Sequence, residues 1–132
     1  MAQVGPVSRW ELFRVDLDPA VGSEQRGDRR PALVVSNDGF NAHFDVVTVI
    51  PLTGARGKRR RAYPFEVLLP AGAAGNPEDS IAMPQQVRTI SKMRLLESMG
   101  VLADPGLQLE VESRLLEHLG IDFEIEYPGG SP

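Results

Sequence analysis

The sequence predicts a mainly β fold, a small antiparallel barrel with one helix near its C-terminal end. At least five short apolar segments are separated by polar or by glycine- and proline-rich turns. One longer segment with helical periodicity follows them. Short strands in series before a terminal helix are typical of a small barrel whose helix packs against one end.

Three strands are predicted in the first half of the chain. Residues 11–17 place Phe13, Val15 and Leu17 on one face at a period of two, which indicates a half-buried strand. Residues 31–36 form a β-branched run with proline only at its first position, as expected of a buried strand. We expect a loop over the next nine residues and a third strand at 45–52.

The second half begins with weaker strand signals and ends in the predicted helix. Residues 63–70 alternate as a strand does, 71–79 form a turn region, 80–90 carry one or two strands, and 91–100 predict a short helical turn. The helix begins after Asp104 as N-cap, with Pro105 at its first position, and stops at Gly120. Its predicted apolar stripe consists of Val111, Leu115, Leu116 and Leu119.

Length and composition predict one domain over 1–132, with its core at about 9–123 and a flexible tail at 124–132. The 132 residues are 42% hydrophobic, which is enough for a core. The absence of cysteine excludes disulfides and thiolate metal sites. No apolar run approaches the roughly 18 residues of a spanning helix, and no secretory signal opens the chain. We therefore expect a cytoplasmic protein without a membrane partner.

The charge distribution allows an anion site on a chain whose net charge is −4. Of the 14 basic residues, five lie between positions 56 and 61, which leaves nine to set against 18 acidic residues. Many of the acidic residues are in the last third of the chain. One region is thus strongly positive and another strongly negative, which favours binding of a polyanion. A solvated basic loop is the alternative interpretation of the run.

The loop at 21–31, VGSEQRGDRRP, is unusually dense in groups that bind anions. Arg30 directly precedes Pro31, which biases it toward an extended conformation where the next strand begins. A guanidinium held there can bind a phosphate through two parallel hydrogen bonds. The neighbouring candidates in this loop are Ser23, Glu24, Gln25 and Arg29.

Other polar residues lie near predicted strand ends. Thr53 closes the strand that ends in VIPLT, where it is either a ligand of the same anion or an ordinary turn threonine. Gln86 and Arg88 form a further cluster, and an arginine within a strand favours a ligand or an intersubunit partner.

The loop NDGFNAHF carries two phenylalanines among amides. Phe40 and Phe44 either stack on single-stranded bases or fill the core, while Asn37 and Asn41 can read base edges.

Several chemistries lack the residues that they need. Only His43 and His118 are present, and the position of His118 beside the apolar stripe favours a place at the boundary of the core. No HExxH, phosphate-binding P-loop, GxSxG or carboxylate metal loop is found. We expect no cofactor and no metal site.

Taken together, these segments resemble the MazF/PemK family of toxin endoribonucleases from bacterial toxin–antitoxin pairs. The matching motifs occur in family order: VDLDPAVGSEQ with RRPALVVSND, VIPLT, YPFEV and QVRTISKMRL. The resemblance implies a compact SH3-like barrel and a homodimer. It also implies sequence-specific, metal-independent cleavage of single-stranded RNA and inhibition by the acidic segment of a cognate antitoxin.

The resemblance also assigns roles to three residues. The family's catalytic arginine, which precedes the proline, falls on Arg30, its catalytic hydroxyl falls on Thr53, and its important glutamate falls on Glu24 as a base or an orienting group. The ribose 2′-hydroxyl would attack the adjacent phosphorus to give a 2′,3′-cyclic phosphate and a 5′-hydroxyl. The residues assigned to RNA binding are Ser23, Gln25, Arg29, Asn37, Asn41, Arg56, Lys58, Arg59, Arg60, Gln86 and Arg88.

The chain departs from the family pattern at three places. Trp10 stands where glycine is usual, and Gln85 replaces a common acidic residue. The arginine loop is one residue longer because of Asp28-Arg29, which leaves the division of work between Arg29 and Arg30 open.

Two functions of other classes remain as alternatives. One is a barrel that binds single-stranded nucleic acid without catalysis, since binding and cleavage would use the same arginines. The other is a gyrase poison of the same fold, which is disfavoured because the chain ends in GGSP rather than in aromatic and apolar residues.

Overall fold

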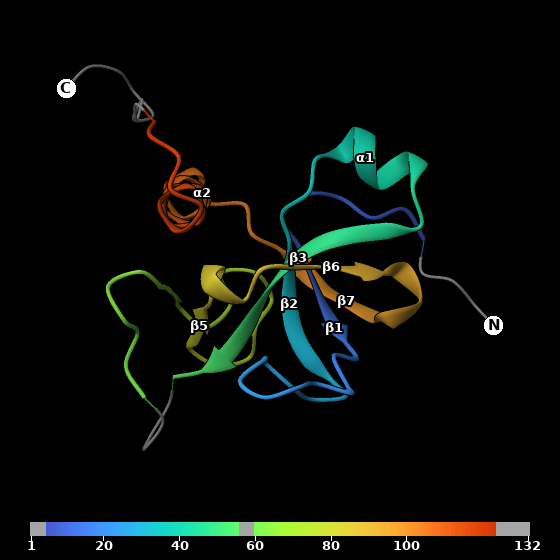
Figure 1. Ribbon diagram of the computed structural model, residues 1–132, viewed down its shortest axis with the longest axis horizontal. Coiled ribbons are helices and arrows are strands. Elements are labelled where there is room, and N and C mark those ends of the chain that lie inside the picture. Colours follow the sequence, from blue (N-terminus) through green and yellow to red (C-terminus); the bar gives the residue numbers. More distant parts are fainter. Residues whose placement is uncertain (1–4, 56–59, 124–132) are drawn as a thin grey trace.

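A computed structural model describes residues 5–55 and 60–123, which form one curved antiparallel sheet with a helix beside it (Figure 1). The strand order is β4-β5-β3-β2-β1-β7, and β6 pairs with β3 outside this path. Within the described residues no pairing joins β4 to β7, so the sheet is open and the predicted closed barrel is not confirmed. The strands are β1 (Glu11–Val15), β2 (Arg30–Val34), β3 (Val46–Gly54), β4 (Val67–Leu69), β5 (Ser80–Ala82), β6 (Arg88–Ser91) and β7 (Leu95–Val101).

The C-terminal helix α2 (Pro105–His118) forms where the sequence predicts it. The Asp104 carboxylate accepts hydrogen bonds from the N–H groups of Gly106 and Leu107, which caps the first turn. The helix contacts β4 and the 3₁₀ turn η1 (Pro84–Gln86). The predicted apolar stripe extends too far, because Leu119 is 55% exposed at the end of the helix. His118 is also exposed, so its predicted place at the core boundary is wrong.

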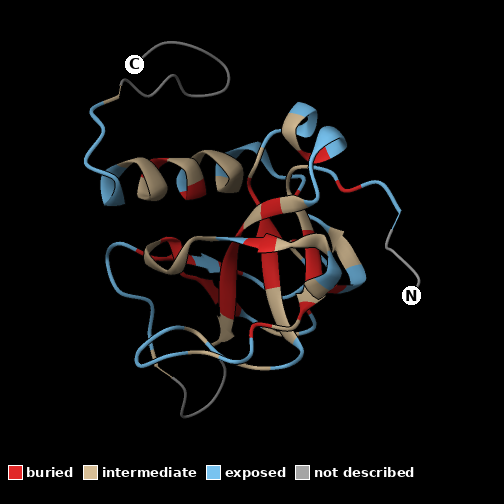
Figure 2. Ribbon diagram, turned by 45° about the vertical axis from the view of Figure 1, so that its right-hand side comes forward, coloured by how far each residue is buried: buried red, intermediate tan, exposed pale blue. Residues whose placement is uncertain are grey.

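The core lies on both faces of the sheet, and buried residues fill its central strands (Figure 2). Adjacent side chains of a strand point to opposite faces. Accordingly, Leu12 belongs to the cluster beneath α2, whereas Phe13 and Val15 belong to the cluster on the other face. The strand expected to be half-buried is therefore buried on both sides.

Two segments differ from their predicted local structure. The expected loop at 37–45 contains a short helix, α1 (Asp38–His43), which begins because the Asn37 side chain accepts the N–H of Phe40. The expected helical turn at 91–100 contains the 3₁₀ turn η2 (Lys92–Arg94), but Ser91 ends β6 and the residues from Leu95 onward form β7. Pairing with β1 decides the conformation of β7, and tertiary pairing overrides a local helical preference.

Across the described part of the chain, the helices are too short or too polar to span a bilayer.

Candidate active site

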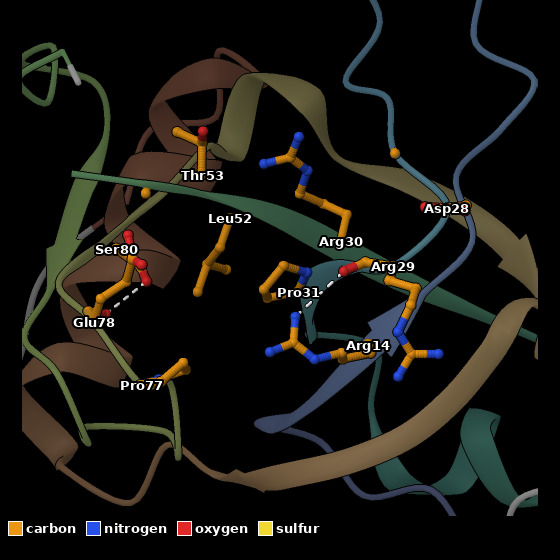
Figure 3. A pocket seen from close by; sticks show the side chains of 12 residues that line it. Arg14, Asp28, Arg29, Arg30, Pro31, Leu52, Thr53, Pro77, Glu78 and Ser80 are labelled. Carbon is orange, nitrogen blue, oxygen red and sulfur yellow. Dashed lines mark hydrogen bonds between the residues drawn. The ribbon is translucent and has the colours of Figure 1, made fainter. Parts of the chain in front are cut away.

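A pocket of about 300 Å³ opens where β2 begins and β3 ends (Figure 3). Two loops complete it: the arginine loop between β1 and β2, and the turn region between β4 and β5. Its lining residues are Arg14, Gly27, Asp28, Arg29, Arg30, Pro31, Leu52, Thr53, Gly54, Pro77, Glu78 and Ser80.

Arg30 is fixed at the pocket by pairing and by its own loop. It is the first residue of β2, opposite Val15 of β1. Its Nε donates to the Arg26 carbonyl at 3.1 Å. With the Gln25 amide oxygen turned toward Arg30, which satisfies both groups, that oxygen accepts from Nε at 3.1 Å and from Nη2 at 3.2 Å. The guanidinium is therefore held in place before any ligand arrives.

Arg29 and Arg14 complete the cationic side of the pocket. Arg29 forms an ion pair with Glu97 of β7, and both side chains are more than half exposed. Arg14 donates from Nη1 to the Arg29 carbonyl at 3.3 Å. We name Arg14, Arg29 and Arg30 the arginine wall. Arg29 divides its charge between the pocket and a surface carboxylate, which favours Arg30 for the catalytic role.

The arginine loop is braced from η1 by Gln86. The Gln86 amide donates from Nε2 to the Ser23 carbonyl at 3.0 Å and accepts the N–H of Gln25 at 3.1 Å through Oε1. At the base of the loop, the Asp18 carboxylate accepts the N–H of Gly27 at 3.1 Å. Gln86 was assigned to RNA binding, but both ends of its amide bind the loop in this structure.

Thr53 lines the same pocket from the far end of β3, where it pairs with Ile81 of β5. The structure thus brings together Arg30 and Thr53, which are 23 positions apart in the sequence. Figure 3 shows both side chains at the same end of the pocket.

The opposite side of the pocket carries residues that sequence reasoning missed. Pro77, Glu78 and Ser80 lie across from the arginine wall (Figure 3), and we name them the acidic wall. The segment AGAAGNPED reads only as a turn region, so no local signal points to a pocket.

Several residues assigned to the site do not line the pocket, among them Glu24, Asn41 and Asn37. The exposed Glu24 carboxylate accepts the N–H of Val21 at 2.8 Å within its own turn. Asn41 is 1% exposed, and its amide exchanges hydrogen bonds with the hydroxyl and carbonyl of Ser36. The assignment of Asn41 to RNA is therefore wrong, because its polar atoms are buried in bonds that join α1 to Ser36, in the segment that follows β2. Asn37 is used as the cap of α1.

The basic run is anchored at one end by an ion pair. Arg60 donates two hydrogen bonds to the buried Glu66 carboxylate, at 2.6 and 2.9 Å, and Gln85 donates a third at 2.5 Å. Burial raises the pKa of Glu66, but these bonds and the Tyr63 N–H outweigh it, so that pKa lies below its usual value. The pKa of Arg60 is raised, chiefly through its hydrogen bonds to Glu66.

Arg60 is accordingly a structural anchor, and its charge is largely compensated before RNA arrives. It also lies over the Tyr63 ring at 4.8 Å, and Tyr63 stacks on Phe65. Arg56, Lys58 and Arg59 lie outside the described residues. Arg88 begins β6, and its buried Nη1 has no hydrogen-bond partner in the described part of the chain.

The phenylalanines of the α1 segment stack on each other, with ring centroids 4.8 Å apart. Phe44 is 56% exposed and does not fill the core, whereas Phe40 is partly buried. Among the described residues, no group of three histidine or acidic side chains is placed to hold a metal ion.

The fold and this site match a known family. Residues 8–119 match the model of the PemK-like, MazF-like toxin of type II toxin–antitoxin systems. The chain is 41% identical over 118 residues to the endoribonuclease MazF9 of Mycobacterium tuberculosis, which covers 86% of this chain and 96% of that protein. The chain therefore belongs to the family of PemK-like and MazF-like toxins.

Solved structures agree with this family. MazF of Deinococcus radiodurans superposes with a TM-score of 0.74 at 29% identity, over 89% of this chain and 100% of that one. A mycobacterial endoribonuclease in complex with its cognate antitoxin has the same fold, with a TM-score of 0.69 at 21% identity over 92% of this chain and 100% of that one.

Proposed function

We propose that this toxin cleaves single-stranded RNA at the pocket between the two walls, without a metal ion. Its family membership makes it an endoribonuclease toxin of a type II toxin–antitoxin system. The single observation that carries the proposal is the shared pocket of Arg30 and Thr53. A preorganised cation and a hydroxyl in one pocket are suited to hold a phosphodiester and to stabilise the charge that develops during its cleavage.

The proposed nucleophile is the 2′-hydroxyl of the RNA. Its oxygen gives up its proton to solvent and attacks the adjacent phosphorus, and the bond from phosphorus to the 5′-oxygen breaks. The departing 5′-oxygen takes a proton from solvent, so a 2′,3′-cyclic phosphate and a 5′-hydroxyl result. Arg30 stabilises the charge on the phosphoryl oxygens, because a guanidinium stays protonated in a protein and does not act as a base. Thr53 donates a hydrogen bond to the same group.

Glu24 keeps an indirect role in this proposal. Its carboxylate fixes the turn that precedes Gln25, and Gln25 in turn contacts Arg30. Glu24 is thus a positioning residue. Arg29 and Arg61 are placed to attract the RNA backbone, since both are exposed.

The proposed partners follow from the family and from the charge of the site. An acidic segment of a cognate antitoxin would compete with RNA for the arginine wall. We also infer that the protein is a homodimer. We further infer that its curved sheet is that of an SH3-like barrel and that the protein acts in the cytoplasm, where its RNA substrate is found. Sedimentation at micromolar concentration tests the dimer, and a monomer would contradict it.

Purified protein, end-labelled single-stranded RNA and EDTA test the activity. We expect cleavage in EDTA with cyclic phosphate ends, and no cleavage when the scissile nucleotide is 2′-deoxy. Cleavage of the deoxy-substituted RNA would overturn the mechanism. Retention of RNA without cleavage would favour the binding barrel, and neither binding nor cleavage would favour a gyrase poison.

A further inference from the structure

Two pairs of aromatic rings stack on each other in the described part of the chain, and they lie at different distances from the pocket. Tyr63 and Phe65 precede β4, with ring centroids 5.4 Å apart. Phe40 and Phe44 belong to the α1 segment, with centroids 4.8 Å apart. We name Tyr63 and Phe65 the aromatic platform.

Both rings of the aromatic platform are open to solvent. Tyr63 is 52% exposed and Phe65 is 45% exposed. Arg61, two residues before Tyr63, is exposed as well. Apolar side chains that are exposed next to each other mark interaction sites more often than single ones do. Two rings beside an exposed cation suit a ligand that combines flat apolar faces with negative charge.

A buried carboxylate holds the aromatic platform in place. Glu66 is 4% exposed and accepts the N–H of Tyr63 at 3.0 Å. It also accepts two hydrogen bonds from Arg60, whose guanidinium lies 4.8 Å from the centre of the Tyr63 ring. The ring is thus held through its backbone and through one of its faces. A surface that is ordered before the ligand arrives loses less conformational entropy on binding.

Strand pairing places the aromatic platform near the pocket. Val67, two residues after Phe65, pairs with Ala82 of β5, and Ala82 pairs with Leu52 of β3. Leu52 is one of the residues that line the pocket. Two steps between neighbouring strands, of about 4.8 Å each, put Val67 about 10 Å from Leu52.

The turn η1 joins the aromatic platform to the arginine loop. Gln85 donates to the Glu66 carboxylate at 2.5 Å, and the next residue, Gln86, bonds to the backbone of Ser23 and Gln25. Two neighbouring side chains of one short turn therefore hold the platform on one side and the loop that carries Arg30 on the other. An RNA strand bound at Arg30 can reach the platform along the surface of the protein.

The other stacked pair lies at the far end of the sheet. Phe44 is 56% exposed, so its accessibility resembles that of Tyr63. However, α1 connects the end of β2 to the start of β3, whereas the pocket lies at the start of β2 and the end of β3 (Figure 1). The nine residues of β3 amount to about 25 Å of strand. Phe44 is therefore a matched control for the aromatic platform.

We propose that the aromatic platform is a stacking site for one base of the bound RNA, outside the two nucleotides that the scissile phosphate joins. The proposal rests on the proposed function, since it takes RNA as the ligand. Every base has a flat face, so such a site adds affinity for single strands with little dependence on sequence. The platform lengthens the RNA site beyond the pocket.

Binding of an uncleavable substrate tests the proposal. The probe is an RNA that the wild-type protein cleaves, labelled and carrying a 2′-deoxy nucleotide at the scissile position. By fluorescence anisotropy, Tyr63→Ala and Phe65→Ala should each weaken its binding by about tenfold, within the range for one stacked base. Tyr63→Phe keeps the ring and should bind as the wild type does, as should Phe44→Ala.

Cleavage kinetics separate this role from catalysis. On the all-ribose RNA, the two platform variants should raise KM by about tenfold, the loss expected for one stacked base, and leave kcat at saturating RNA near the wild-type value. Should an alanine variant fail to fold in urea denaturation, Tyr63→Leu and Phe65→Leu keep apolar bulk without the ring. They should show the same rise in KM.

A modified nucleotide locates the stacked base. 2-Aminopurine loses fluorescence when it stacks, so it is placed in turn at each position on both sides of the cut. We expect quenching by the wild-type protein and by Phe44→Ala at one position outside the scissile pair, and its loss in Phe65→Ala. An abasic nucleotide at that position should weaken wild-type binding by about tenfold and Phe65→Ala binding by less than about twofold.

Four outcomes would overturn the inference. The first is unchanged RNA binding in both platform variants, and the second is an equal loss in Phe44→Ala. The third is a fall in kcat without a rise in KM. The fourth is weaker binding of an acidic antitoxin peptide with RNA binding intact, which would assign the platform to a protein partner. In each case the wild-type protein still cleaves RNA, so the proposed function stands. A wild-type protein that neither binds nor cleaves RNA would refute that function itself.

Discussion

The two walls of the pocket are held in place by different kinds of interaction. Two residues of the arginine wall, Arg29 and Arg30, are carried by a partly exposed loop. Arg30 donates to a carbonyl of this loop, and Gln86 bonds to backbone groups of Ser23 and Gln25. The acidic wall belongs to a segment that is seated by a buried asparagine and by contact between two backbones. One wall is held by polar groups near the surface and the other by burial.

This difference explains why one wall is visible in the sequence and the other is not. A loop that binds anions needs several cationic and amide groups close together, and their density marks the segment VGSEQRGDRRP. A loop that is held by burial needs only small residues and one buried polar side chain. The sequence of such a loop cannot be distinguished from that of an ordinary turn. The two walls should also respond differently to mutation.

The largest expected effect comes from the arginine wall. Arg30→Ala should lower kcat by about 10²–10³-fold, the scale for losing one donor to a developing negative charge. Its free energy of unfolding should fall by only about 1 kcal/mol, because the side chain bonds to its own partly exposed loop. Single-turnover cleavage and chemical denaturation of the same preparation measure the two quantities. Unchanged kcat with weakened RNA binding would contradict the catalytic assignment.

Mutations in the segment that carries the acidic wall should act by lowering the free energy of unfolding. Gly75 and Gly72 both have φ of +86°, but only Gly75 is crowded by another backbone. Gly75→Ala should lower the free energy of unfolding by about 2–4 kcal/mol, from the backbone conformation together with overpacking. Gly72→Ala, the matched control, should cost about 1 kcal/mol. Urea denaturation compares them, and equal losses would show that the contact with β7 is not tight.

A third variant tests the ion pair that anchors the basic run. Glu66→Gln should lower the free energy of unfolding by about 1–2 kcal/mol at pH 7, because a charged acceptor is replaced by a neutral one. The pKa of Glu66 lies below its usual value, so its contribution is present above about pH 4 and is lost as the pH falls further. The stability difference between wild type and variant should therefore shrink at low pH. A constant difference from pH 7 to 3 would contradict this assignment.

The smallest expected effect comes from the brace of the arginine loop. Gln86→Ala removes both side-chain bonds to residues 23–25 and should lower the free energy of unfolding by about 1 kcal/mol. Cleavage should slow on every sequence alike, since the brace positions Arg30 and does not read a base. A change in sequence preference would instead favour the original assignment of Gln86 to RNA.

Features that depend on neighbouring residues could be predicted from the sequence. Asp104 and Pro105 set the start of α2, since a capping carboxylate and a fixed φ act within one turn. The order Arg30-Pro31 indicated the extended start of β2, and the density of cations in the loop before it indicated an anion site. The family motifs likewise lie in short continuous segments.

Tertiary structure alone decided the features that depend on contacts between distant residues. Residues 95–101 form a strand because they pair with β1. The described sheet is open because β4 and β7 do not pair. Asn41 was buried against Ser36, and Arg60 was compensated by Glu66. Glu78 faces Arg30 across the pocket only because Asn76 and β7 seat its loop, and no local pattern encodes a contact between parts of the chain that folding brings together.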